Sequence, residues 1–205
     1  MHRTREGPSA TGAQSRAQNV SVTDQWTDVS SAILVEGASD RAAVLTAARI
    51  LEVDLAAEGT VVVPMGGAMS VRRFAADLGA SGAGLRLRGL CDAAEVRFFE
   101  RAGLPADAVF VCRPDLEGEL LRALGHSRVE AALEEEGDLR LFRMFQQQPA
   151  QRTRSLELQL HRFLGTTSGR KEQYGEALTT ALTPAELPAP LRDVVLAAVA
   201  DAALG

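Results

Sequence analysis

The segment Ser31-Ala32-Ile33-Leu34-Val35-Glu36-Gly37-Ala38-Ser39-Asp40 decides the fold. Its first five residues form a short apolar run of the kind found in strands that are covered on both faces. The run ends at Glu36. Apolar residues then recur at helical spacing from Ala42 to Leu51, which predicts a helix, and Ser39 and Asp40 before them are good N-cap residues. The segment therefore predicts a buried strand, a tight turn that carries a carboxylate, and a helix.

Three further strand and helix pairs follow along the chain. The expected strands cover residues 61–65, 85–90 and 108–112, and the expected helices cover residues 70–78 and 94–101 and begin again near residue 116. Strands that alternate with short helices through connections of a few residues indicate parallel βαβ units with right-handed crossovers. We therefore predict an α/β fold with a four-stranded parallel sheet and helices on both of its faces.

The two ends of the sequence have a different character. Residues 1–28 are rich in polar residues and lack apolar periodicity, which predicts a flexible tail. After Gly125 only helical patterns occur, at residues 129–135, 139–145, 155–164, 171–182 and 191–204. We therefore divide the chain into a tail (1–28), an α/β domain (29–125) and a C-terminal α-helical extension (126–205) that packs on the α/β domain.

Composition excludes several classes of protein. The net charge of -5 argues against a protein that coats nucleic acid nonspecifically, because such binding depends on Lys and Arg neutralising phosphates. No apolar run approaches the roughly 18 residues that a membrane span needs, so we expect a cytoplasmic protein with no membrane partner. Cys91 and Cys112 lie inside apolar runs and are predicted to be core residues, not parts of a disulfide or a zinc site.

Carboxylates follow three of the four expected strands. Glu36 closes the first strand, Asp92 the third and Asp115 the fourth, while Asp40 and Glu117 follow within the same turns. In open α/β sheets, ligands bind at the carboxyl ends of the strands. Like charges gathered there imply a compensating cation, and oxygen ligands without nearby His or Cys suit Mg²⁺ or Mn²⁺. We therefore predict that these five side chains form a metal site.

Several acidic residues also have a plainer interpretation. For Asp40 or Asp115 taken alone, the favoured role is to cap the following helix. Asp92 could cap the third helix or serve as a phosphoacceptor of the receiver type. Glu95 is more typical of the surface of a helix, as are Glu100 and Glu119. The scattered histidines His2, His126 and His161 have no ligand spacing, and we assign them no role.

The sequence Val35-Glu36-Gly37-Ala38-Ser39-Asp40 resembles the opening motif of TOPRIM domains, in which an apolar strand delivers a glutamate into a V-E-G turn. Within that group, V-E-G-x-S-D resembles the TOPRIM domain of overcoming lysogenization defect (OLD) nucleases. The resemblance covers about residues 31–125, with weaker similarity onward to Tyr174, and it implies a Rossmann-like TOPRIM domain. Its further motifs occur in order at Val63–Gly67, Gly89–Asp92, Asp115–Glu117 and Glu119–Leu120.

The resemblance implies metal-dependent phosphodiester chemistry on DNA, with one or two Mg²⁺ or Mn²⁺ ions. Glu36 and Asp40 would serve the metal from the first motif, and Asp92 would supply the leading carboxylate of a D-x-D or D-x-E element. Glu117, together with Asp115, would complete the cage. Glu36 also becomes a catalytic candidate.

Lys171, the only lysine in the chain, is the second catalytic candidate, because it falls where OLD-family domains place a lysine near the scissile phosphate. Spacing alone equally allows a solvated lysine at the start of a helix. One departure from the family pattern is Ala94, which occupies the second acidic position of D-x-D. A second metal would lose a ligand there unless Glu95 or water replaces it, so cleavage by two metals is in doubt.

We expect a metal-dependent endonuclease or nucleotidyl-transfer protein that acts on DNA, with a homodimer as a candidate assembly. The alternative is a noncatalytic TOPRIM module that works with a separately encoded ATPase, because OLD nucleases resemble fusions to an ATPase and this sequence has no G-x-x-x-x-G-K-[ST] loop. A receiver-like protein centred on Asp92 ranks last, since the acidic motif after the fourth strand has no place in it.

Overall fold

The computed structural model describes residues 28–165 and 168–200, apart from the side chains of residues 168–170. The predicted tail, except for its last residue, lies outside the described residues. The strands are β1 (Ser31–Val35), β2 (Thr60–Pro64), β3 (Arg86–Asp92) and β4 (Val109–Cys112). The helices are α1 (Ala38–Ile50), α2 (Val71–Leu78), α3 (Val96–Arg101), α4 (Leu116–Glu135), α5 (Leu139–Gln146), α6 (Leu156–Leu164), α7 (Ser168–Thr180) and α8 (Ala189–Ala200), with 3-10 turns at η2 (Ala68–Ser70), η3 (Ala106–Ala108) and η4 (Pro184–Glu186).

The four strands form one sheet in the order β2-β1-β3-β4, and every neighbouring pair is parallel. Leu34 of β1 is paired with Val63 of β2 on one side and with Gly89 of β3 on the other. All five residues of β1 are buried, as expected for a strand with a neighbour on each edge and helices on each face. The predicted α/β fold with a four-stranded parallel sheet is confirmed.

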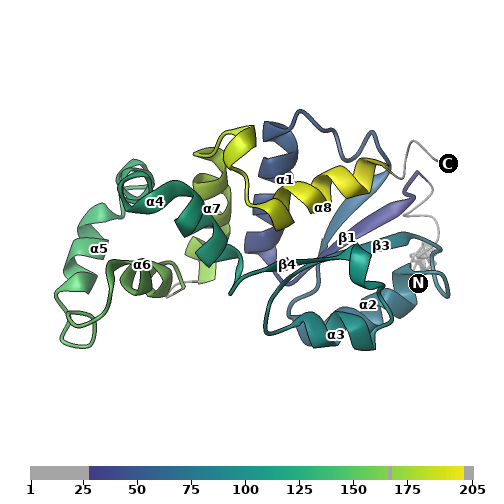
Figure 1. The fold of residues 1–205 in the computed structure, drawn as a ribbon, viewed down its shortest axis with the longest axis horizontal. Helices are drawn as coiled ribbons and strands as arrows, with labels where there is room; N and C mark the ends of the chain where they lie inside the picture. Colours follow the sequence, from purple (N-terminus) through teal and green to yellow (C-terminus); the bar gives the residue numbers. More distant parts are fainter. Residues whose placement is uncertain (1–27, 166–167, 201–205) are drawn as a thin grey trace, which may run out of the picture.

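Successive side chains of β1 enter two separate cores, because they alternate between the faces of the sheet. Ile33 and Val35 pack in a cluster with residues of α1 and α8, whereas Ala32 and Leu34 pack with residues of α2 and α3. Figure 1 shows α1 and α8 on one side of the sheet and α2 and α3 on the other. Both cysteines are buried and unpaired, as the apolar runs around them predicted.

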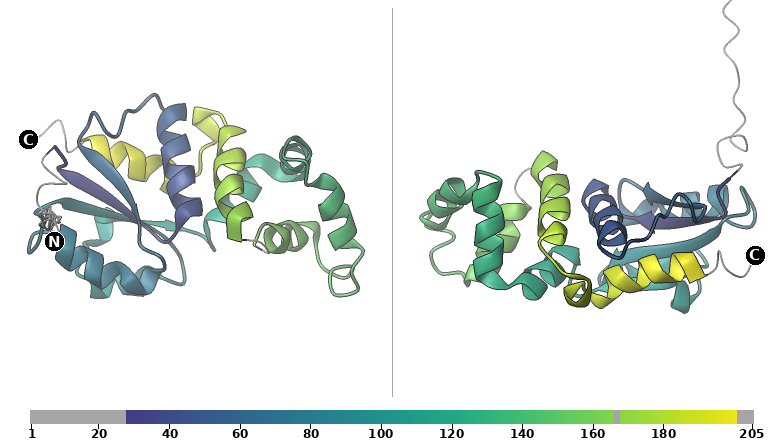
Figure 2. Two further views of the ribbon diagram at one scale, coloured as in Figure 1. Left: turned by 180° about the vertical axis from the view of Figure 1, so that it is seen from behind. Right: turned by 90° about the horizontal axis from the view of Figure 1, so that it is seen from above.

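The chain leaves the sheet after β4 and returns to it only at the end. Helix α4 is kinked at Gly125, where φ is 70°, and leads to α5 and α6, which lie away from the sheet in both Figures 1 and 2. Helix α7 then packs along α1, and α8 packs on the face of the sheet beside β1, β3 and β4. The predicted boundary between residues 125 and 126 falls at this kink, and the division into two parts stays a prediction.

No helix in the described part of the chain is long and apolar enough to cross a membrane. The cytoplasmic location stays a prediction.

Candidate metal site

The carboxyl ends of β1 and β3 open onto one pocket. Connections from β1 and β3 run to opposite edges of the sheet, so a crevice forms between these two adjacent strands, where open α/β folds bind ligands. The structure brings five of the six predicted site residues to this pocket: Glu36, Asp40, Asp92, Glu117 and Lys171. Gly37, Ala38, Ser39 and Glu172 complete its lining. Its walls come from four segments that are distant in the sequence.

The turn that carries Glu36 is held by the end of β2. The Glu36 carbonyl accepts hydrogen bonds from the amides of both Gly66 and Gly67, each at 3.0 Å. Those glycines have φ values of 72° and 121°, a region that residues with a Cβ rarely adopt. The Val63–Gly67 motif therefore holds the backbone of Glu36 in place.

Asp40 is the third residue of α1 and not its N-cap. Helix α1 begins at Ala38 with Gly37 as its N-cap, so the expectation that Ser39 and Asp40 occupy the N-cap position is wrong, although Asp40 does help to cap the helix. The Asp40 carboxylate reaches back and accepts a hydrogen bond from the Gly37 amide at 2.8 Å, which satisfies one of the free donors at the helix start. Burial raises the pKa of Asp40 to about 6, and the charges of Glu117 and Glu36 add to this effect.

Asp92 lies at the end of β3 and is hydrogen-bonded to the start of α4, the helix that follows β4. Its Oδ1 atom accepts a hydrogen bond from the Leu116 amide at 3.2 Å, so it contributes to the start of α4 and not of α3. Burial raises the pKa of Asp92 to about 7, with further contributions from the negative charges of Asp40, Asp115 and Glu117. Ionised, this carboxylate needs a positive partner.

Glu95 belongs to the same cluster, which corrects its assignment to the surface of a helix. Carboxylate oxygens of Glu36, Asp92 and Glu95 all lie within 4.8 Å of one another. The Oε2 atom of Glu95 is buried and has no hydrogen-bond partner among the described residues. Burial, a hydrogen bond to the Glu36 side chain and the charge of Glu36 raise the pKa of Glu95 to about 8.

Asp115 has both of its carboxylate oxygens engaged outside the pocket. Oδ1 caps α4 by accepting a hydrogen bond from the Gly118 amide at 2.8 Å, and Oδ2 lies 2.7 Å from Nε2 of His161. Asp115 is absent from the residues that line the pocket. The geometry thus favours the capping role over the predicted ligand role, and it gives His161 of α6 a contact that no sequence spacing indicated.

Lys171 faces the pocket from the first half of α7. Its Nζ atom lies 3.5 Å from Oε1 of Glu117. Helix α7 comes very close to α1 at Gly175, where an added Cβ would lie 2.4 Å from the Ser39 carbonyl oxygen. A glycine at this point therefore allows Lys171 to reach the carboxylates.

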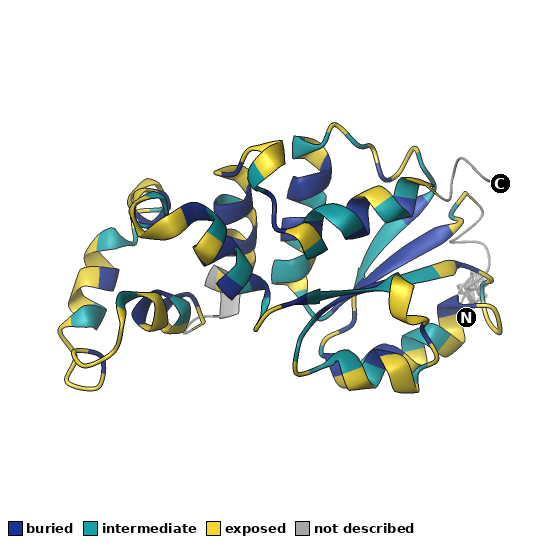
Figure 3. Ribbon diagram, in the orientation of Figure 1, coloured by how far each residue is buried: buried dark blue, intermediate teal, exposed yellow. Residues whose placement is uncertain are grey.

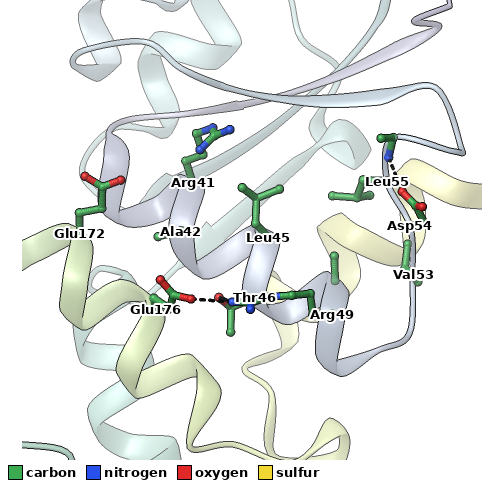
Figure 4. Close-up of a pocket in the computed structure, with 12 residues that line it drawn as sticks. Arg41, Ala42, Leu45, Thr46, Arg49, Val53, Asp54, Leu55, Glu172 and Glu176 are labelled. Carbon is green, nitrogen blue, oxygen red and sulfur yellow. Dashed lines mark hydrogen bonds and ion pairs between the residues drawn. The ribbon is translucent and has the colours of Figure 1, made fainter. Parts of the chain in front are cut away.

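An ion pair fixes α7 to α1 further along the two helices. Figure 4 shows a surface hollow between α1, α7 and the loop after α1, in which Arg49 and Glu176 face each other at 2.8 Å. Leu45 and Leu55 also line this hollow. Glu172 lines both the hollow and the carboxylate pocket, so the two lie side by side along α7.

The donor set fits a hard divalent cation. Within the described residues, the pocket and the adjoining Glu95 offer carboxylate oxygens and no His or Cys, which suits Mg²⁺ or Mn²⁺ better than zinc. The raised pKa values of Asp40, Asp92 and Glu95 show that these groups resist ionisation without a cation. The unpartnered oxygen of Glu95 is a free position for such an ion.

Comparisons with known proteins agree with this architecture. Residues 29–92 match the family described as overcoming lysogenization defect protein-like, TOPRIM domain. The C-terminal region of the Burkholderia pseudomallei OLD protein superposes with a TM-score of 0.64 at 19% identity, covering 84% of this chain and 98% of that one. The C-terminal region of the Xanthomonas campestris pv. campestris OLD protein superposes with a TM-score of 0.66 at 24% identity, covering 86% and 95%.

No curated protein sequence matches the chain significantly. At these identities the solved structures establish the fold, and the family match covers the segments from β1 to the end of β3. Residues 29–92 therefore resemble the TOPRIM domain of OLD proteins, and the chain shares the fold of the C-terminal regions of two OLD proteins.

Proposed function

We propose that the carboxylate pocket binds Mg²⁺ or Mn²⁺ and that the chain performs nuclease or nucleotidyl-transfer chemistry on the phosphodiester bonds of DNA. The observation that carries this proposal is the meeting of carboxylates from β1, α1, β3 and α4 with a lysine from α7 in one pocket. TOPRIM domains in general suggest metal-dependent nucleic-acid chemistry, which supports the same conclusion.

Four residues of the pocket and the adjoining Glu95 have roles in this proposal. Glu36, Asp92 and Glu95 would hold the cation, because their oxygens approach one another most closely. A bound divalent ion supplies Lewis-acid stabilisation of charge on phosphoryl oxygens. Lys171 adds a compact positive charge for the developing negative charge of the phosphate, and Glu117 positions its ammonium group.

The proposal is tested by incubating the purified chain with supercoiled plasmid and Mn²⁺. The wild-type chain should nick the plasmid, and Glu36→Ala should lose at least most of the activity. Glu100→Ala, which removes an exposed carboxylate from α3, is the matched control and should nick as the wild type does. Equal nicking by Glu36→Ala and the wild type would count decisively against the proposal.

A second candidate function is a noncatalytic TOPRIM module that binds one ion and serves a separately encoded ATPase. It is favoured by Ala94, which is exposed and offers no ligand where the family pattern has a second carboxylate. Calorimetry that shows a single weak Mg²⁺ site, together with no plasmid nicking and copurification of an ATPase, would support it. Sedimentation of the purified chain tests the proposed homodimer in either case.

A further inference from the structure

The segment formed by α5, α6 and the turn between them is strongly basic. We call residues 139–165 the helical arm. It carries five arginines and a single acidic residue, Glu157, in a chain whose net charge is -5. Figures 1 and 2 place it at the end of the molecule away from the sheet, and Figure 3 shows that much of its outer surface is exposed. The arginines are Arg140, Arg143, Arg152, Arg154 and Arg162.

Among the described residues, only one arginine of the arm forms an ion pair. Arg143 forms an ion pair with Glu130 at 2.7 Å. The guanidinium groups of Arg152 and Arg154 donate only to backbone carbonyls, at 2.8 and 3.0 Å. Arg140 and Arg162 are exposed and have no ion pair to any described residue. The arm therefore presents positive charge that an external anion can neutralise.

The arm holds these arginines on a rigid support. The ring of Phe163 packs edge to face against Phe142 and Phe145, with centroids 5.2 and 5.6 Å away. The buried Gln159 side chain donates to the carbonyls of Gln151 and Arg154 at 2.9 and 3.1 Å, which ties the turn before α6 to the helix. Binding to the arm therefore costs less conformational entropy than binding to a mobile basic loop would.

The arm has an exposed stripe on α6 and adjoins the carboxylate pocket at its C-terminal end. Leu158, His161 and Arg162 share this stripe, because residues three and four apart lie on the same side of a helix. The Leu158 side chain is 51% exposed, and Nε2 of His161 lies 2.7 Å from Asp115. At the end of the arm, a Cβ added at Gly165 would lie 3.9 Å from Cε of Lys171, and Lys171 lines the pocket, so this end of the arm adjoins the pocket.

We propose that the helical arm binds the sugar-phosphate backbone of nucleic acid and leads it to the carboxylate pocket. This inference rests on the proposed function of the pocket. A pocket lined by carboxylates repels phosphates, so affinity for a polyanion has to come from basic side chains beside it, and phosphate contacts position a duplex without reading its sequence. The arm is a basic surface that meets this need.

The test measures binding without cleavage. Fluorescence anisotropy of a labelled DNA duplex is followed in EDTA, with the full chain carrying Glu36→Ala, over a series of salt concentrations. Arg154→Gln with Arg162→Gln removes two charges from the arm. The matched control, Arg101→Gln with Arg192→Gln, removes two charges from α3 and α8, which lie on the two faces of the sheet.

Loss of two phosphate contacts should make the plot of log affinity against log salt shallower by about 1.8, since each contact contributes about 0.9. The control double variant should keep the slope of its parent, and Arg162→Lys should keep it as well because the charge remains. Equal slopes for the arm and control variants would overturn the inference. The inference would also be overturned if polyglutamate displaced the labelled DNA as well as unlabelled DNA does at the same concentration of negative charge. That result would indicate an acidic protein partner.

The inference and the proposed function can fail separately. Salt-dependent binding through the arm with no nicking in Mn²⁺ would support nucleic-acid binding by the arm and count against nuclease activity. Nicking by the wild-type chain with no difference between arm and control variants would support nuclease activity and overturn the role of the arm.

Discussion

Replacing Asp92 by Asn should stabilise the metal-free protein while it removes a carboxylate from the proposed metal site. The two side chains have nearly the same shape, and the Asn carbonyl oxygen can still accept the hydrogen bond from the Leu116 amide. What changes is the charge, which burial and the neighbouring carboxylates make unfavourable. The difference in the free energy of unfolding between this variant and the wild type therefore measures how much the ionised Asp92 destabilises the folded chain.

The pKa of Asp92 sets the size of the effect. It rises from an ordinary value of 3.8 to about 7 in the folded protein. At about 1.4 kcal/mol for each tenfold change in proton affinity, ionisation at pH 8 costs about 4 kcal/mol in a fully shielded site. Because the carboxyl is only partly buried, screening by water lowers this to about 2 kcal/mol. In a chain of this size, that corresponds to a melting temperature about 4–8 °C higher for Asp92→Asn.

The pH dependence follows from the sign of the shift. A raised folded pKa means that the folded chain binds the proton more tightly than the unfolded chain, so stability falls as the pH rises from about 4 through 7. The advantage of Asp92→Asn should therefore shrink at pH 5 to roughly less than half of its value at pH 8.

The assay is thermal unfolding in EDTA at both pH values, followed by circular dichroism. The matched control is Asp77→Asn, which removes an exposed charge from α2 and should leave the melting temperature nearly unchanged. Addition of Mn²⁺ should raise the melting temperature of the wild type and not of Asp92→Asn. An Asp92→Asn variant that melts below the wild type at pH 8 in EDTA would refute this reasoning.

Three further predictions concern the pocket and its supports. Glu95→Gln should weaken Mn²⁺ binding at least tenfold in calorimetry if its unpartnered oxygen holds the ion, and unchanged affinity would remove Glu95 from the site. Gly175→Ala should lower the melting temperature and shift Lys171, because its new methyl group would clash with the Ser39 carbonyl; a melting curve like that of the wild type would show that α7 can move aside freely. Phe142→Ala should cost about 3–5 kcal/mol in denaturant unfolding, since this ring is fully buried in the arm, and a loss below about 1 kcal/mol would mean that the arm folds apart from the cooperative unit.

Local properties of the sequence predicted most of the fold. The strands β1 to β4 begin and end within one or two residues of the apolar runs that indicated them. A strand buried on both faces leaves an uninterrupted apolar run, and a carboxylate directly after such a run is easy to recognise. For this reason Glu36 and Asp92 could be placed at the same edge of the sheet.

Features that depend on tertiary contacts could not be predicted from the local sequence. The order of the strands follows from long-range pairing, and the start of α1 depends on a glycine that has no capping side chain. Glu95 resembles a surface residue because helical spacing does not reveal that the turn before α3 bends it toward Glu36. The contact between His161 and Asp115 joins residues 46 positions apart, with no motif to connect them.

The late return of the chain has a consequence for how the molecule can be divided. Leu191 and Val194 of α8 are completely buried beside the sheet, and Lys171 reaches the pocket from the same final third of the chain. A fragment that stops after β4 would therefore expose an apolar sheet face to water and would also lack the pocket's ammonium group. Folding of the last two helices and assembly of the carboxylate pocket are therefore coupled, so a partly synthesised chain cannot present the complete pocket before its own core has closed.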